Sequence, residues 1–273
     1  MKRVSFIGAG SMAEAVIAGI VNQKVLDGEQ IFVINKENKE RITELKELYG
    51  VQGCTACDER KVVVKQSDVI VIATKPVDVK NALQEFAEYI HENQLIISVV
   101  AGISTDTIVE SVGKNVPVIR TMPNTSATIG YSATAMCKGK YATDNHIEQA
   151  KQLFEAIGMV SIVEEDKMHI VTAISGSGPA YVYYLVEAME KAAKEEGLDE
   201  QIAKQLITQT IIGAGNMLQQ RTESPEVLRE NVTSPNGTTA AGIKTLEQFS
   251  FKEAVIECVK SATRRSEELG KEN

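Results

Sequence analysis

Residues 4–13 read VSFIGAGSMA, a short apolar run followed by a turn that holds two glycines. An alanine-rich segment with helical spacing continues from there to about Gln23. A short, mainly apolar run, a glycine turn and a helical pattern predict a strand, a loop and a helix. Gly8 permits the tight turn, and Gly10 lets the backbone approach a ligand closely. The chain therefore opens with the first half of a β-α-β unit.

The same alternation continues through the first half of the chain. The next apolar run, residues 31–34, ends in Asn35-Lys36 and is followed by a charged helical stretch to about Leu48. Further strands are predicted at residues 69–73, 95–99 and 116–120, with helical patterns at 77–89 and 105–112 between them. Strands that alternate with helices predict a parallel, doubly wound sheet of the Rossmann type.

Beyond about Val163 strand patterns disappear, and helices are predicted at residues 167–195, 200–220, 224–231 and 239–269. The fold class is thus α/β, with a dinucleotide-binding domain at 1–163 and a helical dimerisation and substrate domain at 164–273. Residues 202–217 are apolar on nearly every face, more than one small helical domain buries easily. We expect a partner subunit to cover them; a central helix wrapped by its own domain is the alternative.

The composition of the chain limits the kinds of molecule that it is expected to bind. The 273 residues are 43% hydrophobic and 24% charged, which excludes a wholly disordered or fibrous chain. A net charge of −8 argues against nucleic-acid binding and favours small molecules or other subunits. The longest weakly polar stretch, 170–189, holds two glycines, a proline and Glu187, so no membrane span is expected.

The four cysteines are too few for a disulfide framework, and no secretory leader pattern precedes the first strand. The expected location is therefore the cytoplasm. Cys54 and Cys57 form one Cys-x-x-Cys, but a zinc site needs a second ligand pair. We predict inert thiols and no metal site.

The glycine turn predicts a dinucleotide site. Its third fingerprint position is Ala13, which is tolerated because only a small residue is needed where helix meets strand. The helix that begins near Ser11 and Met12 offers free backbone N–H groups and a positive dipole end to a pyrophosphate. Gly8 and Gly10 complete this set of candidate residues. A glycine turn without a ligand is the alternative.

The end of the second strand indicates which dinucleotide binds. NAD sites usually place an acidic residue there for the ribose 2′-OH, whereas NADP needs neutral or basic groups for a phosphate. Asn35 and Lys36 stand there, so NADPH is predicted, with Glu37 leaving NADH open. Two further loops leave the carboxyl ends of predicted strands and are assigned to the same site: Thr74-Lys75-Pro76 and Ala101-Gly102.

The second half holds a candidate substrate site. Pro235-Asn236-Gly237 predicts a turn, and Thr238 and Thr239 then open the last long helix. Such a helix start can bind a carboxylate. The alternative is that one of the two hydroxyls merely caps the helix.

With these segments in place, the chain resembles the pyrroline-5-carboxylate reductase family over nearly its whole length. The most specific match lies within 225–247, where these residues stand at the spacing of the family signature: Leu228, Val232, Thr233, Ser234, Gly237, Thr239, Gly242, Ile243 and Leu246. Four further segments follow the family in the right order: Gly8-Ala9-Gly10, Thr74-Lys75-Pro76, Met122-Pro123-Asn124-Thr125 and Ser175-Gly176-Ser177-Gly178-Pro179-Ala180-Tyr181.

The resemblance implies NAD(P)H-dependent reduction of L-1-pyrroline-5-carboxylate to L-proline, the last step of proline biosynthesis. It also implies a homo-oligomer, an intertwined helical dimer often assembled into decamers. By position, Thr239 resembles the catalytic threonine that hydrogen-bonds the ring nitrogen, and Gly237 and Thr238 the backbone donors to the carboxylate. Glu165 matches an acidic residue near bound proline. Asn231 matches a cofactor-contacting asparagine, and these pieces come from the neighbouring subunit.

Two positions depart from the family. Arg60 stands where relatives carry a cofactor-contacting asparagine and is not assigned to the site, and Ser126 replaces a proline. Two other functions remain open at this point. One is a dehydrogenase of the same architecture that acts on a β-hydroxy acid and relies on a lysine in the helical domain. The other is a nucleotide-sensing or interaction protein that keeps the fold without turnover.

Overall fold

A computed structural model describes residues 3–272, which pack into two compact units. One unit combines the chain up to Ser177 with the stretch from Ser261 onward, and the other is Gly178–Lys260. Residues 164–177 therefore pack with the sheet. These units differ in extent from the domains expected at 1–163 and 164–273, and that domain boundary stays a prediction.

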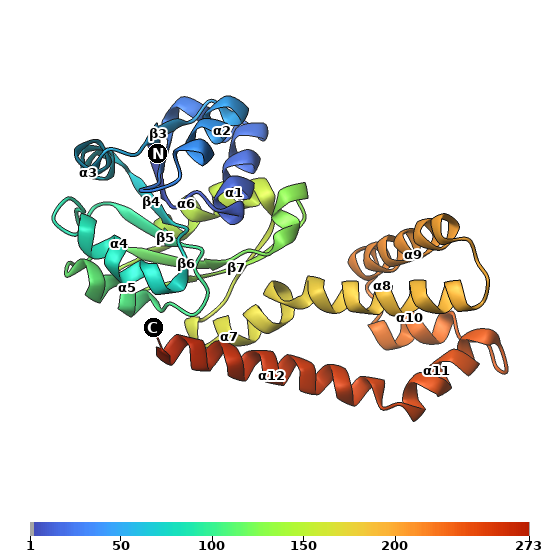
Figure 1. Ribbon diagram of the computed structural model, residues 1–273. Helices are drawn as coiled ribbons and strands as arrows, with labels where there is room; N and C mark the ends of the chain where they lie inside the picture. The colour runs from blue at the N-terminus through green and yellow to red at the C-terminus, as the bar shows by residue number, and fades with distance from the viewer. Residues whose placement is uncertain (1–2, 273) are drawn as a thin grey trace. The chain divides into compact units, whose positions relative to one another are not determined.

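The first unit is built on an eight-stranded sheet in the order β3-β2-β1-β4-β5-β6-β7-β8 (Figure 1). Every neighbouring pair is parallel except β6 and β7, which are antiparallel. The strands are β1 Val4–Ile7, β2 Ile31–Ile34, β3 Gln52–Cys54, β4 Val69–Ile72, β5 Leu95–Ser98, β6 Val118–Met122, β7 Ser132–Lys138 and β8 Gly158–Ile162. The predicted doubly wound sheet is confirmed.

Six helices cover the two faces of this sheet: α1 Ser11–Asn22, α2 Lys39–Tyr49, α3 Cys57–Gln66, α4 Val79–Phe86, α5 Thr105–Val112 and α6 Asp144–Phe154. Successive side chains of a strand point to opposite faces. Phe6 and Val71 accordingly pack with α1, α2 and α6, whereas Ile70 and Ile72 pack with α3, α4 and α5. Burial on both faces explains why the parallel strands read as continuous apolar runs.

The chain winds in two directions from the middle of the sheet. β1 pairs with β2 on one side and with β4 on the other, so Ile7 lies beside both Ile34 and Ile72. This reversal of strand order opens a crevice at the carboxyl ends of β1 and β4. Open α/β sheets bind ligands at such a switch point.

The strands predicted at 4–7 and 31–34 are confirmed residue for residue, and the other three lie within two residues of the observed ones. β3, β7 and β8 were not predicted. β3 has only three residues, and β7 mixes small polar and apolar residues (SATAMCK). β8 is largely exposed. None of them forms the apolar run that marks a strand buried on both faces. Helices α3 and α6 were also missed.

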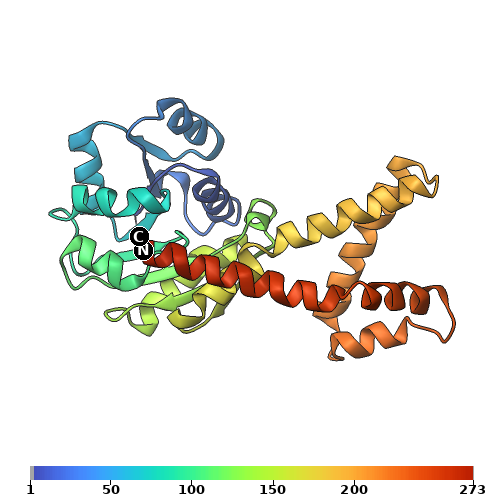
Figure 2. The ribbon, with the colours of Figure 1, turned by 60° about the horizontal axis from the view of Figure 1, so that its bottom comes forward.

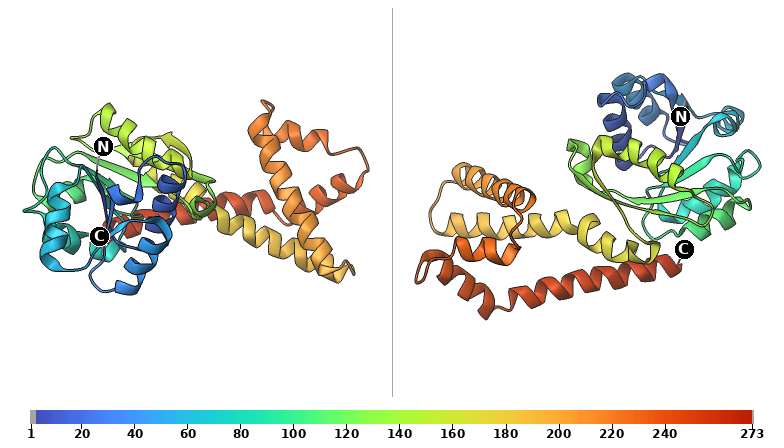
Figure 3. Two further views of the ribbon diagram at one scale, coloured as in Figure 1. Left: turned by 90° about the horizontal axis from the view of Figure 1, so that it is seen from above. Right: turned by 180° about the vertical axis from the view of Figure 1, so that it is seen from behind.

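The second unit contains only helices among its described residues: α8 Gly178–Glu195, α9 Glu200–Gln220, α10 Pro225–Asn231, α11 Thr238–Gln248 and the first part of α12 Phe251–Glu272 (Figure 3). The helix predicted at 200–220 is confirmed as α9. The helix predicted at 167–195 begins as α7 Met168–Val171 and passes through a π-helical turn, Thr172–Gly176, before α8. The serine- and glycine-rich segment marks this irregularity.

The single helix predicted at 239–269 is wrong, because α11 and α12 are separate. The helix is interrupted at Phe249 and Ser250, and Ser250 has φ 51°. A non-glycine residue in the left-handed region ends a helix without the glycine or proline signal that sequence patterns rely on. The last turns of α12, from Ser261, belong to the sheet unit and are visible at its end in Figure 2.

Helix α9 keeps much of its apolar surface in solvent. Ile202 is 48% exposed, Leu206 58% and Met217 45%. A helix wrapped by its own unit would bury these side chains, so that alternative is wrong for this chain. No helix within residues 3–272 is both long and apolar enough to cross a membrane.

The cysteines of the sheet unit should differ sharply in reactivity. Burial, together with Glu59, raises the pKa of the Cys54 thiol to about 11, and burial with Glu165 raises the pKa of Cys137 to about 12. Cys57 is exposed. Because the thiolate is the nucleophile, we expect iodoacetamide at mildly alkaline pH to modify Cys57 in the native protein, and Cys54 and Cys137 only after unfolding. Peptide mass spectrometry checks this, and rapid native labelling of Cys54 would contradict it.

Candidate functional site

The loop after β1 passes very close to the end of β4. Gly8 has φ +113°, and its N–H donates to the carbonyl oxygen of Ile34 at 3.0 Å. A Cβ at Gly8 would lie 2.3 Å from the carbonyl oxygen of Ala73, closer than real Cβ contacts allow. Gly10 differs, because a Cβ there would meet no atom within 4 Å. The fold requires glycine at position 8, whereas Gly10 borders open space.

Helix α1 presents its N-terminus at that open space. Gly10 is its N-cap, and no side chain caps the helix. The N–H groups of the first turn, which includes Ser11 and Met12, therefore have neither an intrahelical nor a side-chain partner. Ala13 is 1% exposed and packs in the core, as the small third fingerprint position requires. The start of α1 therefore has open space and free N–H groups, and its binding of an anion stays a prediction.

An arginine outside the predicted set holds this loop in place. Arg41 of α2 donates from Nε to the carbonyl oxygen of Ala9 at 3.2 Å and forms ion pairs with Glu14 of α1 and with Glu44. Hydrogen bonds to Glu44 and Glu14 raise the pKa of Arg41. Burial, followed by the Glu14 charge, raises the pKa of Tyr49, whose hydroxyl donates to Glu14. The sequence pattern of this segment predicts only a charged surface helix. It does not indicate that Arg41 contacts the glycine loop.

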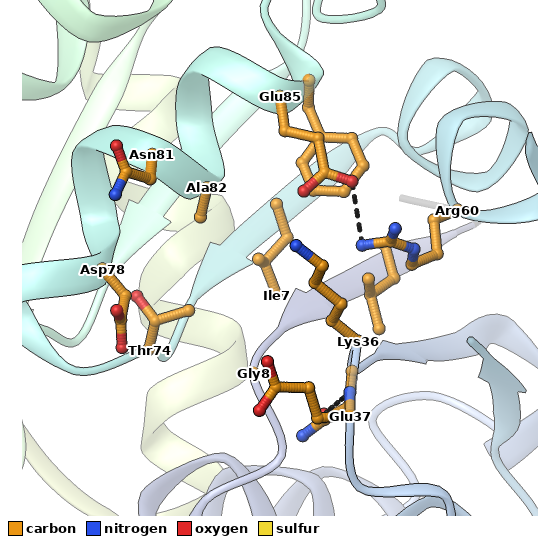
Figure 4. Close-up of a pocket in the computed structure, with 13 residues that line it drawn as sticks. Ile7, Gly8, Lys36, Glu37, Arg60, Thr74, Asp78, Asn81, Ala82 and Glu85 are labelled. Carbon is orange, nitrogen blue, oxygen red and sulfur yellow. Dashed lines mark hydrogen bonds and ion pairs between the residues drawn. The ribbon is translucent and has the colours of Figure 1, made fainter. Parts of the chain in front are cut away.

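A pocket of about 590 Å³ lies at the carboxyl ends of β1, β2 and β4 (Figure 4). Four of the predicted cofactor residues line it: Gly8, Asn35, Lys36 and Thr74. Asn35 Oδ1 accepts the N–H groups of Glu37 and Asn38, each at 3.0 Å, and so shapes the turn that carries Lys36. Thr74 Oγ1 is buried and has no hydrogen-bond partner within the described chain.

The other predicted cofactor residues do not line this pocket. Lys75 and Pro76 are exposed at the start of a short 3-10 helix, Pro76–Asp78. Ala101 and Gly102 follow β5, and a Cβ on Gly102 would sit 3.6 Å from Gly270 of α12. Their contacts with a cofactor stay predictions.

Glu165 is held by groups of the sheet unit. Its carboxylate accepts from the N–H and Oγ1 of Thr105, at 2.8 and 2.6 Å, and from Arg120 Nη1 at 3.4 Å. Arg120 is only 3% exposed. Nearby, His169 Nδ1 lies 3.0 Å from Ser266 Oγ of α12, and burial, with the Arg120 charge, lowers the pKa of His169. Sequence reasoning placed Glu165 beside a substrate and missed its anchoring of the start of α5.

The part of the chain that the structure describes holds no cluster of side chains that could bind a metal ion. No three His, Cys, Asp or Glu side chains come together there as ligands.

In the second unit, a tight turn precedes the two threonines. Asn236 has φ 61°, and the N–H of Gly237 donates to the carbonyl oxygen of Ser234 at 3.0 Å. Gly237 is the N-cap of α11, and no side-chain hydrogen bond caps this helix. The alternative in which Thr238 or Thr239 serves as a routine cap is therefore wrong. Because the Gly237 N–H is engaged, the amides of the first turn, beginning with Thr238, are the ones left for a ligand.

A further residue that was predicted to contact the cofactor, Asn231, stands shortly before this turn in the sequence. Asn231 is the exposed last residue of α10. No contact of its side chain tests its predicted role toward the cofactor, which stays a prediction.

The two loop glycines give a matched pair of substitutions. Gly8→Ala places a Cβ against Ala73 in a strained conformation, and we expect it to cost about 3 kcal/mol or more of unfolding free energy. Gly10→Ala should keep the melting temperature nearly unchanged yet weaken dinucleotide binding about tenfold or more, because the methyl group occupies the space beside the α1 N-terminus. Thermal unfolding and fluorescence titration with NADPH separate the two effects. A Gly10→Ala variant that binds as tightly as the parent would contradict this account of the loop.

Two protein-family models match segments of this chain. Residues 165–269 match the family model described as pyrroline-5-carboxylate reductase dimerisation, and residues 3–102 match the one described as NADP oxidoreductase coenzyme F420-dependent. Pyrroline-5-carboxylate reductase 1 of Bacillus subtilis (strain 168) is 45% identical over 271 residues, 99% of this chain and 90% of that protein.

Two solved structures are similar over their full length. A pyrroline-5-carboxylate reductase from Coxiella burnetii superposes with a TM-score of 0.90 at 32% identity, covering 98% of each chain. The pyrroline carboxylate reductase of Plasmodium falciparum, with NADP bound, gives 0.88 at 29% identity, covering 98% of each chain. On this similarity along its whole length, the chain belongs to the pyrroline-5-carboxylate reductase family.

Proposed function

We propose that this protein reduces L-1-pyrroline-5-carboxylate to L-proline, the last step of proline biosynthesis, with NADPH as the preferred hydride donor and NADH as the second. The 45% identity to a Bacillus reductase over 99% of the chain carries the proposal. A β-hydroxy acid dehydrogenase and a nucleotide sensor share the fold alone, and neither accounts for the match to the dimerisation model at 165–269.

The described pocket fits a dinucleotide. It lies at the switch point of the sheet, beside the uncapped N-terminus of α1, where a pyrophosphate is stabilised by free N–H groups and the helix dipole. Thr74 Oγ1 supplies a buried hydroxyl that has no hydrogen-bond partner among residues 3–272. Lys36 follows β2 at the position that distinguishes NADP from NAD. Gly8 would shape the turn, and Gly10, Ser11 and Met12 would hold the pyrophosphate.

The chemistry needs orientation more than acid or base strength. A protonated C=N carbon is already electrophilic, and the reduced nicotinamide supplies the hydride when it is bound. The α11 N-terminus would hold the substrate carboxylate through the Thr238 amide. The hydroxyl of Thr239 would hydrogen-bond the ring nitrogen and keep the imine in one orientation. We also place Glu165 near the substrate and Asn231 near the cofactor, by family resemblance.

The dimerisation domain at 165–269 indicates self-association. We propose an intertwined helical dimer, assembled further into decamers, in which the partner covers the exposed apolar side chains of α9. Because these side chains are already about half-buried, covering each of them would contribute roughly half of the 1.5–3 kcal/mol that full burial gives, and the contributions together favour association. Thr239 of one subunit would then serve the dinucleotide of another. The four unpaired cysteines support our proposal of a cytoplasmic location.

The proposed reaction is tested by mixing the purified protein, NADPH and pyrroline-5-carboxylate and following the loss of NADPH absorbance. We expect consumption to depend on the five-membered imine, to be slower with its six-membered homologue, and to yield proline by amino-acid analysis. Tight NADPH binding without any turnover would support the sensor alternative instead. Turnover with β-hydroxy acids and NADP⁺ alone would support the dehydrogenase.

Thr239→Ala should lower kcat/KM for pyrroline-5-carboxylate about tenfold to a hundredfold, the loss of one polar interaction of roughly 1.4 to 2.7 kcal/mol. Thr239→Ser keeps a hydroxyl and should retain most of the activity. NADPH affinity and oligomeric state, measured for both variants, serve as controls for folding. Unchanged steady-state kinetics in Thr239→Ala would remove this side chain from the mechanism.

A further inference from the structure

Arg60 is a pocket residue that the proposed function does not yet use. It comes from α3, lines the 590 Å³ pocket, and leaves only 7% of its side chain exposed. Its Nη1 lies 2.9 Å from Oε1 of Glu85 on α4, and its guanidinium lies 5.9 Å from the centre of the Phe86 ring. Figure 4 shows the Arg60–Glu85 pair at one end of the pocket. A buried arginine at a ligand pocket invites a functional explanation.

The hydrogen-bonding capacity of Arg60 is not exhausted by Glu85. A guanidinium carries five N–H donors, and burying one is costly unless they are satisfied. The structure gives Arg60 one ion pair to a single carboxylate oxygen, and its Nε is buried with no hydrogen-bond partner within the described chain. Carboxylates usually meet arginine through two parallel hydrogen bonds. Arg60 is therefore held by a weaker contact than its chemistry permits.

A second cation faces the same end of the pocket. Lys36 extends past Ile7 toward the side where Arg60 and Glu85 meet, whereas the Glu37 carboxylate lies on the Gly8 side (Figure 4). Lys36 and Arg60 thus lie at the same end of the pocket as Glu85, and Glu37 lies away from them. A dinucleotide with its pyrophosphate at the α1 N-terminus directs its adenosine ribose toward the end of β2, which carries Lys36.

We propose that Arg60 is the specificity-determining residue for the cofactor: together with Lys36 it binds the 2′-phosphate of NADPH, and Glu85 competes with that phosphate for the guanidinium. A phosphate monoester carries up to about two negative charges and three acceptor oxygens, so it outcompetes a singly charged carboxylate that makes one contact. NADH has only a hydroxyl at this position and leaves Arg60 with Glu85. The inference rests on the proposed use of a nicotinamide dinucleotide and adds which residues discriminate.

Two variants of the full-length protein test this by calorimetric titration with NADPH and with NADH, which measures binding and not turnover. Arg60→Gln should weaken NADPH about tenfold or more and change NADH by less than about twofold. Glu85→Gln should tighten NADPH about threefold or more, because the competing charge is removed, and leave NADH unchanged. In the Arg60→Gln background, Glu85→Gln should have no effect on NADPH, which shows that the two side chains act through each other.

Several results would overturn the proposal. Equal weakening of both dinucleotides in Arg60→Gln would assign Arg60 to the adenine or to the fold. Unchanged NADPH affinity would leave the Arg60–Glu85 pair purely structural. If Arg60→Gln does not fold, Glu85→Gln decides alone, and unchanged or weaker NADPH binding refutes the competition. Reduction of pyrroline-5-carboxylate by the parent protein is scored separately, so a failure of the proposed function is not confused with a failure of this inference.

Discussion

The close passage of the β1 turn against the end of β4 is the constraint on which the rest of the sheet unit depends. A Cβ at Gly8 would lie 2.3 Å from the Ala73 carbonyl oxygen, so the two central strands can adopt this geometry only with glycine there. The turn places the start of α1 beside the crevice where strand order reverses. Arg41 then fixes the loop through Ala9. One steric requirement thus positions the pocket and its anion-binding helix end together.

The proposed active site draws on both units, and the groups that each unit contributes differ in how far they are already enclosed. The sheet unit holds a formed pocket with Lys36, Thr74 and Arg60 in its wall. The helical unit holds an uncapped helix start, α11, and an α9 whose apolar side chains remain exposed. Exposed apolar surface of this extent marks a contact face. On the proposed function, the substrate-binding groups of α11 are placed only when a partner subunit is present, so we expect activity to depend on assembly.

Sequence patterns predicted what depends on burial and on backbone freedom. The strands at 4–7 and 31–34 and the helix at 200–220 follow from apolar runs and helical spacing, and the glycine loop follows from its steric demands. β8 is mostly exposed, so it carries no apolar run, and the break at Ser250 has no glycine or proline to announce it. These features are set by tertiary contacts that local patterns do not encode.

The site shows the same division. Asn35 and Lys36 were predicted from their place after β2 and line the pocket. Arg41 was missed because its partner, the Ala9 carbonyl, is distant in sequence. Arg60 was left out because it departs from the family's asparagine, and its ion pair with Glu85 of α4 cannot be read from the sequence pattern. Glu165 was predicted to lie near the substrate. Its hydrogen bonds to Thr105 join residues sixty positions apart, and local sequence patterns do not predict such contacts.

We propose that the α11 threonines of one subunit lie beside the dinucleotide held in the β1–β4 crevice of another. A crystal structure of the assembled protein with NADP⁺ and L-proline tests it most directly. We expect the pyrophosphate at the start of α1 beside Gly10, and the Thr239 hydroxyl of a neighbouring subunit within hydrogen-bonding distance of the proline nitrogen. A dinucleotide bound elsewhere, or proline remote from every Thr239 in the assembly, would contradict it.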